Sequence, residues 1–160
     1  MKAATIHDLK QELSDIPPAR VMELCLRLAR FKKENKELLT YLLFEAHNEE
    51  AYIDSVKKEI TELFADLPGP NLHLTKKSLR KILRIANKHI RYIGTDLAQA
   101  ELLLCFCREL KKSDIPIRKS TAIINIYNRQ LEKVTAAIKE LHEDLQYDYV
   151  KELEAVSSEQ

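Results

Sequence analysis

The sequence predicts an all-α protein built as an antiparallel stack of seven or eight helices. Apolar residues recur at the three- and four-residue spacing of helices along nearly the whole chain, and the period-two alternation of strands is almost absent. Glycine is also scarce, because Gly69 and Gly94 are the only two among 160 residues. Residues of high helix propensity dominate the composition instead, as helical proteins require.

Three similar tripeptides punctuate this helical pattern. Each has the form Asp-(Ile/Leu)-Pro, and they begin at Asp15, Asp66 and Asp114, so their offsets are 51 (66 − 15) and 48 (114 − 66) residues. Periods of that size are typical of helical repeats, and a HEAT-like solenoid is therefore one form that the stack can take. A tripeptide of this kind also suits any turn between helices, so both interpretations stay open.

The first half of the chain divides into four expected helices. They cover residues 6–14, 18–32, 35–46 and 49–66. Pro17 and Pro18 interrupt the first helix and suit the start of the second, because proline is tolerated in the first turn of a helix. Asn48 is a suitable N-cap for the fourth.

Pro68, Gly69 and Pro70 form the clearest break in the chain. We expect one domain over residues 1–160, with this break at about 67–74 separating an N-terminal from a C-terminal helical half. After it, helices are expected over residues 76–93, 97–112 and about 119–156. Thr75 is the expected N-cap of the first of these, Gly94 its C-terminal stop, and Thr95 or Asp96 the cap of the next.

The helix over residues 76–93 segregates its charges. The stretch "KKSLRKILRIANKHIRYIG" contains seven Lys or Arg and no acid. At 100° per residue its aliphatic side chains fall on one side, and six cations fall within an arc of about 100° on the other. These six cations form the basic ridge: Lys77, Arg80, Lys81, Arg84, Lys88 and Arg91. At 1.5 Å per residue the ridge is about 20 Å long, which suits contact with several phosphates.

Other features of the chain compete with a nucleic-acid interface. Only Tyr92 offers an aromatic ring beside the ridge, and no helix-turn-helix or zinc-finger signature surrounds it. Counter-charge is available, since residues 45–66 hold seven acids and two lysines and residues 129–160 hold eight acids and four bases. The ridge is therefore a solvated or internally paired face, a contact for an acidic protein partner, or a contact for nucleic-acid phosphates.

The cysteines indicate core packing rather than chemistry. Cys105 and Cys107 are two residues apart and so point to opposite sides of a helix, where they cannot join each other or share a metal. The apolar stretch over residues 102–107 is typical of a central, fully surrounded helix, and Cys25 is expected to pack in the same way. An odd number of cysteines without a chelating pattern suits a reducing, cytoplasmic location.

No catalytic, metal or cofactor motif is present. The five histidines are scattered singly, and there is no Glu-x-x-His, no Gly-rich phosphate loop and no nucleophile elbow. The sequence thus predicts no metal, no cofactor and no enzyme, although a small enzyme with a dispersed site stays an alternative. No signal peptide is expected, and the longest apolar run, over residues 102–107, is far below the roughly 18–20 residues that span a bilayer.

A heptad-like seam runs along the expected last helix. Its apolar residues alternate at spacings of three and four, which is typical of packed helices and of self-association surfaces. Two tyrosines near its end are suitable interface anchors. The C-terminal seam comprises Tyr127, Leu131, Val134, Ile138, Leu141, Tyr147 and Tyr149. Packing within the chain and contact with a partner, or with a second copy in a homodimer, are both open for it.

The N-terminal quarter resembles the start of uncharacterised bacterial all-helical proteins of unknown function. The resemblance rests on a leucine-lysine helix, a leucine-rich helix and a turn into the next helix. Its residues are Leu9, Lys10, Leu13, Leu24, Leu28, Phe31, Lys32, Lys36, Glu37, Tyr41 and Leu42. It implies an all-helical fold and no catalytic residue. We therefore expect a non-enzymatic helical interaction module that binds a protein partner or itself, the alternative being a nucleic-acid-associated protein that uses the basic ridge.

Overall fold

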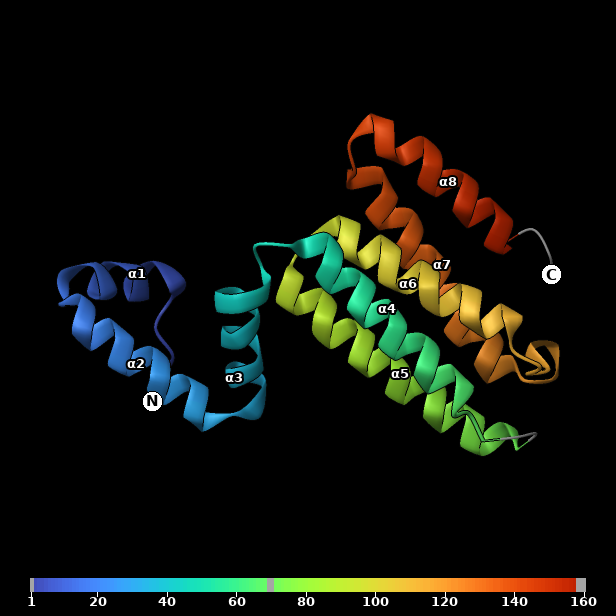
Figure 1. Ribbon diagram of the computed structural model, residues 1–160, viewed down its shortest axis with the longest axis horizontal. Helices are drawn as coiled ribbons and strands as arrows, with labels where there is room; N and C mark the ends of the chain where they lie inside the picture. The colour runs from blue at the N-terminus through green and yellow to red at the C-terminus, as the bar shows by residue number, and fades with distance from the viewer. Residues whose placement is uncertain (1, 69–70, 158–160) are drawn as a thin grey trace. The chain divides into compact units, whose positions relative to one another are not determined.

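The computed structural model describes residues 2–68 and 71–157, which contain eight α-helices and no strand. The helices are α1 (Ile6–Asp15), α2 (Pro18–Phe31), α3 (Lys33–Thr40), α4 (Glu49–Ala65), α5 (Leu72–Ile93), α6 (Asp96–Lys112), α7 (Thr121–Glu140) and α8 (Glu143–Ser157) (Figure 1). A π-helical turn, η1 (Tyr41–Glu45), follows α3, and a 3-10 turn, η2 (Ile117–Lys119), precedes α7. The predicted all-α multi-helix stack is confirmed, whereas its HEAT-like repeat character stays a prediction.

The chain forms two compact units, Met1–Glu45 and Ala46–Gln160, which we call unit 1 and unit 2. The break at about 67–74 lies inside unit 2, between α4 and α5, which pack against each other. Two residues of that break, Gly69 and Pro70, lie outside the described residues. Proline and glycine interrupt a helix through a local effect on the backbone. The break in the sequence therefore predicts the end of a helix, and it does not predict where a compact unit ends.

Unit 1 consists of α1, α2, α3 and η1 and has almost no interior. Tyr41, which is 4% exposed, is its one buried residue among residues 2–45. The N-terminus of α1 is well formed, since Thr5 and Asp8 exchange hydrogen bonds in a capping box. Cys25, however, is exposed, so the expected core position is wrong for this cysteine. Too few helices surround α2 to bury both of its sides.

Unit 2 is built around α6. This helix packs against α4, α5, α7 and α8, and every residue over 102–107 is buried. Phe106 meets Phe64 of α4 edge to face, with ring centroids 5.3 Å apart. The predicted central, fully surrounded helix is thus confirmed, and Cys105 and Cys107 are free thiols in this core.

The C-terminal segment departs from the expected long helix. We expected continuity from about residue 119 to 156, but α7 ends at Glu140 and Leu141 is extended, with φ −75° and ψ 161°. The chain then turns, and α8 packs back on α7 and α6 (Figure 1). The turn is stabilised by the Gln146 amide, which donates to the carbonyls of Lys139 and Leu141 at 3.1 and 2.7 Å. Burial of one side of α8 favours this break, and neither glycine nor proline is needed for it.

The basic helix begins earlier than predicted. Its N-cap is Asn71, whose side-chain oxygen accepts from the backbone N–H groups of His73 and Leu74. Thr75 is therefore not the cap, and it lies buried within α5, where its hydroxyl donates to the Asn71 carbonyl at 3.0 Å. The predicted stop at Gly94 is confirmed, because this residue is left-handed with φ 77°.

Candidate functional site

The basic ridge lies on the outer side of a well-packed helix. The opposite side of α5 is buried in unit 2 through Leu79, Ile82 and Ala86, which are at most 2% exposed. These residues anchor α5 against α4 and α6. Because the ridge is on the opposite arc of the helix, packing of the aliphatic side turns the cations towards solvent.

Five of the six ridge cations are exposed and form no ion pair with any residue described in the structure. They are Lys77, Arg80, Lys81, Arg84 and Arg91. Lys88 is half-buried, and its ammonium lies 5.8 Å from the centre of the Tyr92 ring, a cation–π arrangement. The ridge is therefore a cationic surface in which Lys88 is the one half-buried member.

The acidic segments that offer counter-charge to the ridge pair with other residues or face solvent. On α4, Glu59 lies 3.6 Å from His89 of α5, which is not a ridge residue. On α8, Glu152 pairs with Arg108 of α6 at 2.7 Å. No described carboxylate contacts an exposed ridge cation, so the internally paired interpretation of the ridge is not realised in this structure.

The structure does not bring the C-terminal seam together as one surface. Tyr127, Val134 and Ile138 are at most 3% exposed and belong to the core of unit 2. Leu131, Leu141 and Tyr149 are half-buried against the same core. Tyr147 alone among the seam residues is well exposed, at 64%. The regular spacing of the seam thus serves packing of α7 and α8. Tyr147 is exposed, and the Lys151 ammonium lies 4.0 Å from the centre of its ring.

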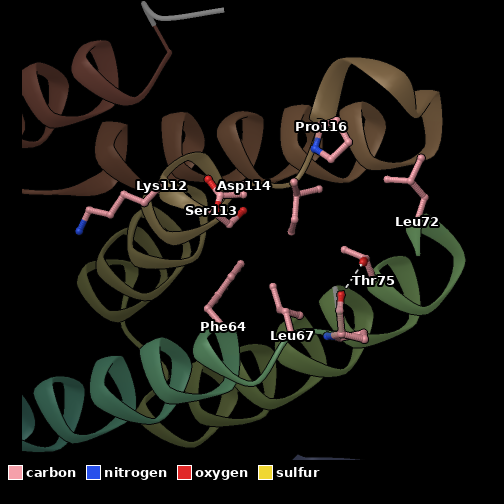
Figure 2. A pocket seen from close by; sticks show the side chains of 10 residues that line it. Phe64, Leu67, Leu72, Thr75, Lys112, Ser113, Asp114 and Pro116 are labelled. Carbon is pink, nitrogen blue, oxygen red and sulfur yellow. Dashed lines mark hydrogen bonds between the residues drawn. The ribbon is translucent and has the colours of Figure 1, made fainter. Parts of the chain in front are cut away.

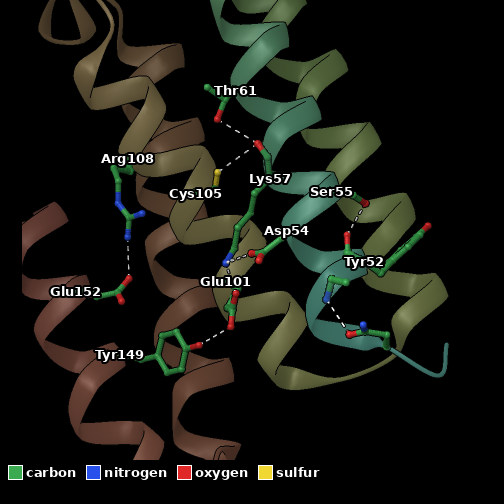
Figure 3. Close-up of polar contacts among 12 residues, drawn as sticks. Tyr52, Asp54, Ser55, Lys57, Thr61, Glu101, Cys105, Arg108, Tyr149 and Glu152 are labelled. Carbon is green, nitrogen blue, oxygen red and sulfur yellow. Dashed lines mark hydrogen bonds and ion pairs between the residues drawn. The ribbon is translucent and has the colours of Figure 1, made fainter. Parts of the chain in front are cut away.

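A polar cluster connects α8 to α4 and α6 (Figure 3). The Lys57 ammonium pairs with Glu101 and lies 3.3 Å from Asp54, while the Tyr149 hydroxyl donates to Glu101 at 2.5 Å. Burial opposes the charge of Lys57, but its hydrogen bond to Glu101 and the attraction of both acids leave its pKa raised. Burial and the bond to Glu101 also raise the pKa of Tyr149.

Several titratable side chains of this cluster line one recess. The recess that it lines measures about 160 Å³, below the roughly 300 Å³ at which small-molecule sites begin. Its acids and bases are bonded to one another, and the bonds join separate helices. Docking of α8 accounts for the arrangement, and no described side chain in it is an activated nucleophile: burial raises the pKa of Cys105.

A larger cavity of about 510 Å³ lies where the α4–α5 and α6–α7 connections meet (Figure 2). Phe64, Leu67 and Leu72 give it an apolar lining. Thr75 lies in its wall, but the hydroxyl is already bonded to the carbonyls of Asn71 and Pro68. The cavity has the size of a ligand site, but the polar side chains of Lys112 and Ser113 in its lining are already engaged, with Glu109 and with the Leu110 carbonyl. We therefore assign it no ligand.

Unit 1 carries a groove that no pattern in the sequence predicted. Its apolar lining comes from α2, α3 and η1, and cations stand around it without an acid among the lining residues. We call this surface the N-terminal groove: Leu26, Ala29, Arg30, Lys32, Lys33, Lys36, Leu39, Thr40, Leu43 and Phe44. The run of cations over residues 30–36 is visible in the sequence, but only the turn between α2 and α3 places it beside apolar side chains.

Comparison with protein-family models, with curated proteins and with solved structures finds no match to this chain. The N-terminal resemblance therefore stays a prediction. Among the described residues, no group of three or more His, Cys, Asp or Glu side chains is placed to hold a metal ion. Nor does any helix in residues 2–68 or 71–157 have the length and apolar character needed to cross a bilayer.

Proposed function

We propose that the protein is a non-enzymatic helical interaction module whose basic ridge binds an acidic surface of a protein partner. One observation carries the proposal: five exposed cations line one side of α5 with no described acid against them. The scarcity of aromatic residues favours a protein over unpaired bases, because single-stranded nucleic acid is usually bound by stacking. A cytoplasmic location is part of the proposal and fits the three free thiols.

The electrostatic environment supports this use of the ridge. No acidic residue occurs between Asp66 and Asp96, so α5 contributes no negative charge of its own to the surface. The aliphatic side of α5 is held by the core, so the cations are presented on a rigid helix rather than on a loop. Oriented charges of one sign raise the rate of encounter with an oppositely charged partner, and this effect falls with salt.

Charge reversal on the ridge tests the proposal. We expect the variant Lys77→Glu, Arg80→Glu, Arg84→Glu to lose partners that the unaltered protein retains from a lysate of its source cell and releases at high salt. The matched control is Arg129→Glu, Lys133→Glu, Lys139→Glu, which reverses three exposed cations of α7 and should retain them. If both variants and the unaltered protein retain the same proteins, the ridge is not the binding surface.

The length of the ridge, about 20 Å at 1.5 Å per residue, also favours a second candidate, a nucleic-acid backbone, because it spans several phosphates. Five engaged cations would give a slope of about −4.5 for log K against log salt on duplex DNA, at about −0.9 per phosphate. Reversal of three ridge cations should then abolish most of that slope. Duplex binding that is absent at low salt, or that is unaltered by the reversal, would exclude this candidate and leave the protein partner.

A further inference from the structure

Unit 1 leaves many large apolar side chains exposed. Ten large apolar side chains between residues 2 and 45 are at least 43% exposed: Ile6, Leu9, Leu13, Met22, Leu26, Leu28, Phe31, Leu42, Leu43 and Phe44. With roughly 150–200 Å² per fully exposed side chain, they present on the order of 1,000 Å². Three of these side chains, Leu26, Leu43 and Phe44, line the N-terminal groove.

The N-terminal groove gives part of this surface a defined shape and charge. It encloses about 560 Å³ between apolar side chains of α2, α3 and η1. Four cations line the groove. One of them, Lys33, pairs with Glu37 at 3.5 Å, and the Lys33 side chain is exposed to solvent. A groove with an apolar interior and a cationic border fits an amphipathic helix that carries acids beside its apolar residues.

The outer side of α8 has that chemistry. Glu143, Tyr147, Val150 and Glu154 follow one another at spacings of four, three and four residues, and therefore lie along one line of the helix. Tyr147 is 64% and Val150 41% exposed. Over its whole length α8 carries five acids and one lysine. The contacts of its inner side with α6 and α7 hold the helix in place, so this outer line is pre-formed.

We propose that two copies of the protein associate reciprocally, with α8 of each copy seated in the N-terminal groove of the other. The apolar pair Tyr147 and Val150 enters the groove, and Glu143 and Glu154 face the cations at its border. A reciprocal exchange uses both surfaces of both copies and so closes at two chains. The basic ridge takes no part in this dimer, and the inference therefore stands or falls independently of the proposed function.

The experiment is a charge exchange between the two surfaces, read by sedimentation equilibrium. The groove variant carries Arg30→Glu, Lys32→Glu and Lys36→Glu, and the helix variant carries Glu143→Lys and Glu154→Lys. All five positions are exposed, so helix content by circular dichroism should be unchanged in both variants. A third chain combines the five substitutions, which restores opposite charges on the two surfaces.

We expect the unaltered protein to show twice the chain mass of 18.6 kDa at roughly 100 μM, where even an interface with a Kd near 10 μM is largely filled. Each single-surface variant should dimerise at least about tenfold more weakly, and the combined chain should recover most of the affinity. The α7 reversal Arg129→Glu, Lys133→Glu, Lys139→Glu and the ridge reversal should leave the mass unchanged.

Three results would overturn the inference. The first is a single-chain mass for the unaltered protein under these conditions. The second is a dimer that neither surface variant weakens, since its interface would then lie elsewhere. The third is a combined chain that stays as weak as the single-surface variants, because the two surfaces would then not face each other.

Discussion

The docking of α8 depends on two donors that share one buried carbonyl. The Val156 carbonyl accepts from the Tyr127 hydroxyl and from the Lys111 ammonium, each at 2.7 Å, and Lys111 also reaches the Ala155 carbonyl at 3.2 Å. Tyr127 is 1% and Val156 5% exposed. The last carbonyls of a helix have no partner within the helix, and a cation there is also favoured by the helix dipole.

We predict a specific pattern of losses when these donors are removed. Tyr127→Phe keeps the ring and leaves the carbonyl its bond to Lys111, so the free energy of unfolding should fall by about 1 kcal/mol. Lys111→Met removes charge-assisted bonds and should lower it by about 2 kcal/mol. The double variant leaves a buried carbonyl without either donor, which adds about 1–3 kcal/mol, so its loss should exceed the sum of the single losses.

Urea unfolding of the four proteins measures these differences through their midpoints and slopes. Hydrogen exchange in α8 should rise in the double variant before exchange in α6 does, because α8 alone loses its attachment. Additive losses would show that the two donors do not share an acceptor. A Tyr127→Phe protein as stable as the parent would refute the account, because the hydroxyl would then not hold the end of α8.

Alkaline pH provides a second readout of the same hydroxyl. Burial, and to a smaller extent the nearby Cys107, raise the pKa of Tyr127 from 10.0 to about 12. The folded state therefore keeps the proton where the unfolded chain has lost it. This stabilisation is complete below pH 10.0 and disappears as the pH rises to about 12. Between pH 10.0 and about 12, the free energy of unfolding should therefore fall less for Tyr127→Phe than for the parent protein. Urea unfolding at a series of pH values measures this difference.

Three other predictions concern separate positions. Thiol labelling of the folded protein should modify Cys25 rapidly and reach Cys105 and Cys107 only on unfolding, because these two are buried and burial raises their pKa; early labelling of three thiols would contradict the core. Gly94→Ala should lower the free energy of unfolding by about 1–2 kcal/mol in urea unfolding, because alanine is strained at the left-handed φ of 77°. An added Cβ would meet nothing within 4 Å, so a steric clash adds nothing to this loss. Asn71→Ala should lower it by about 1 kcal/mol in urea unfolding, whereas no loss would argue against the cap.

Much of the local structure was predictable because it depends on neighbours in the sequence. Gly94 stops α5 and Thr95 caps α6, as expected, since each effect involves only the backbone within one helical turn. The segregation of cations from aliphatic side chains on α5 also follows from spacing alone. Even here a competing local signal misled the prediction: Asn71 caps α5, and Thr75, also a good cap type, lies inside the helix.

The sequence by itself determined that the chain is helical, where most helices lie and which side of α5 is cationic, because periodicity and capping act over a few residues. Only the tertiary structure decided which apolar sides are covered. The seam residues Tyr127 and Val134 became core, while Cys25 and the apolar residues around the N-terminal groove stayed exposed. An apolar side chain carries the same local signal whether a distant helix covers it or not, and burial depends on that distant helix.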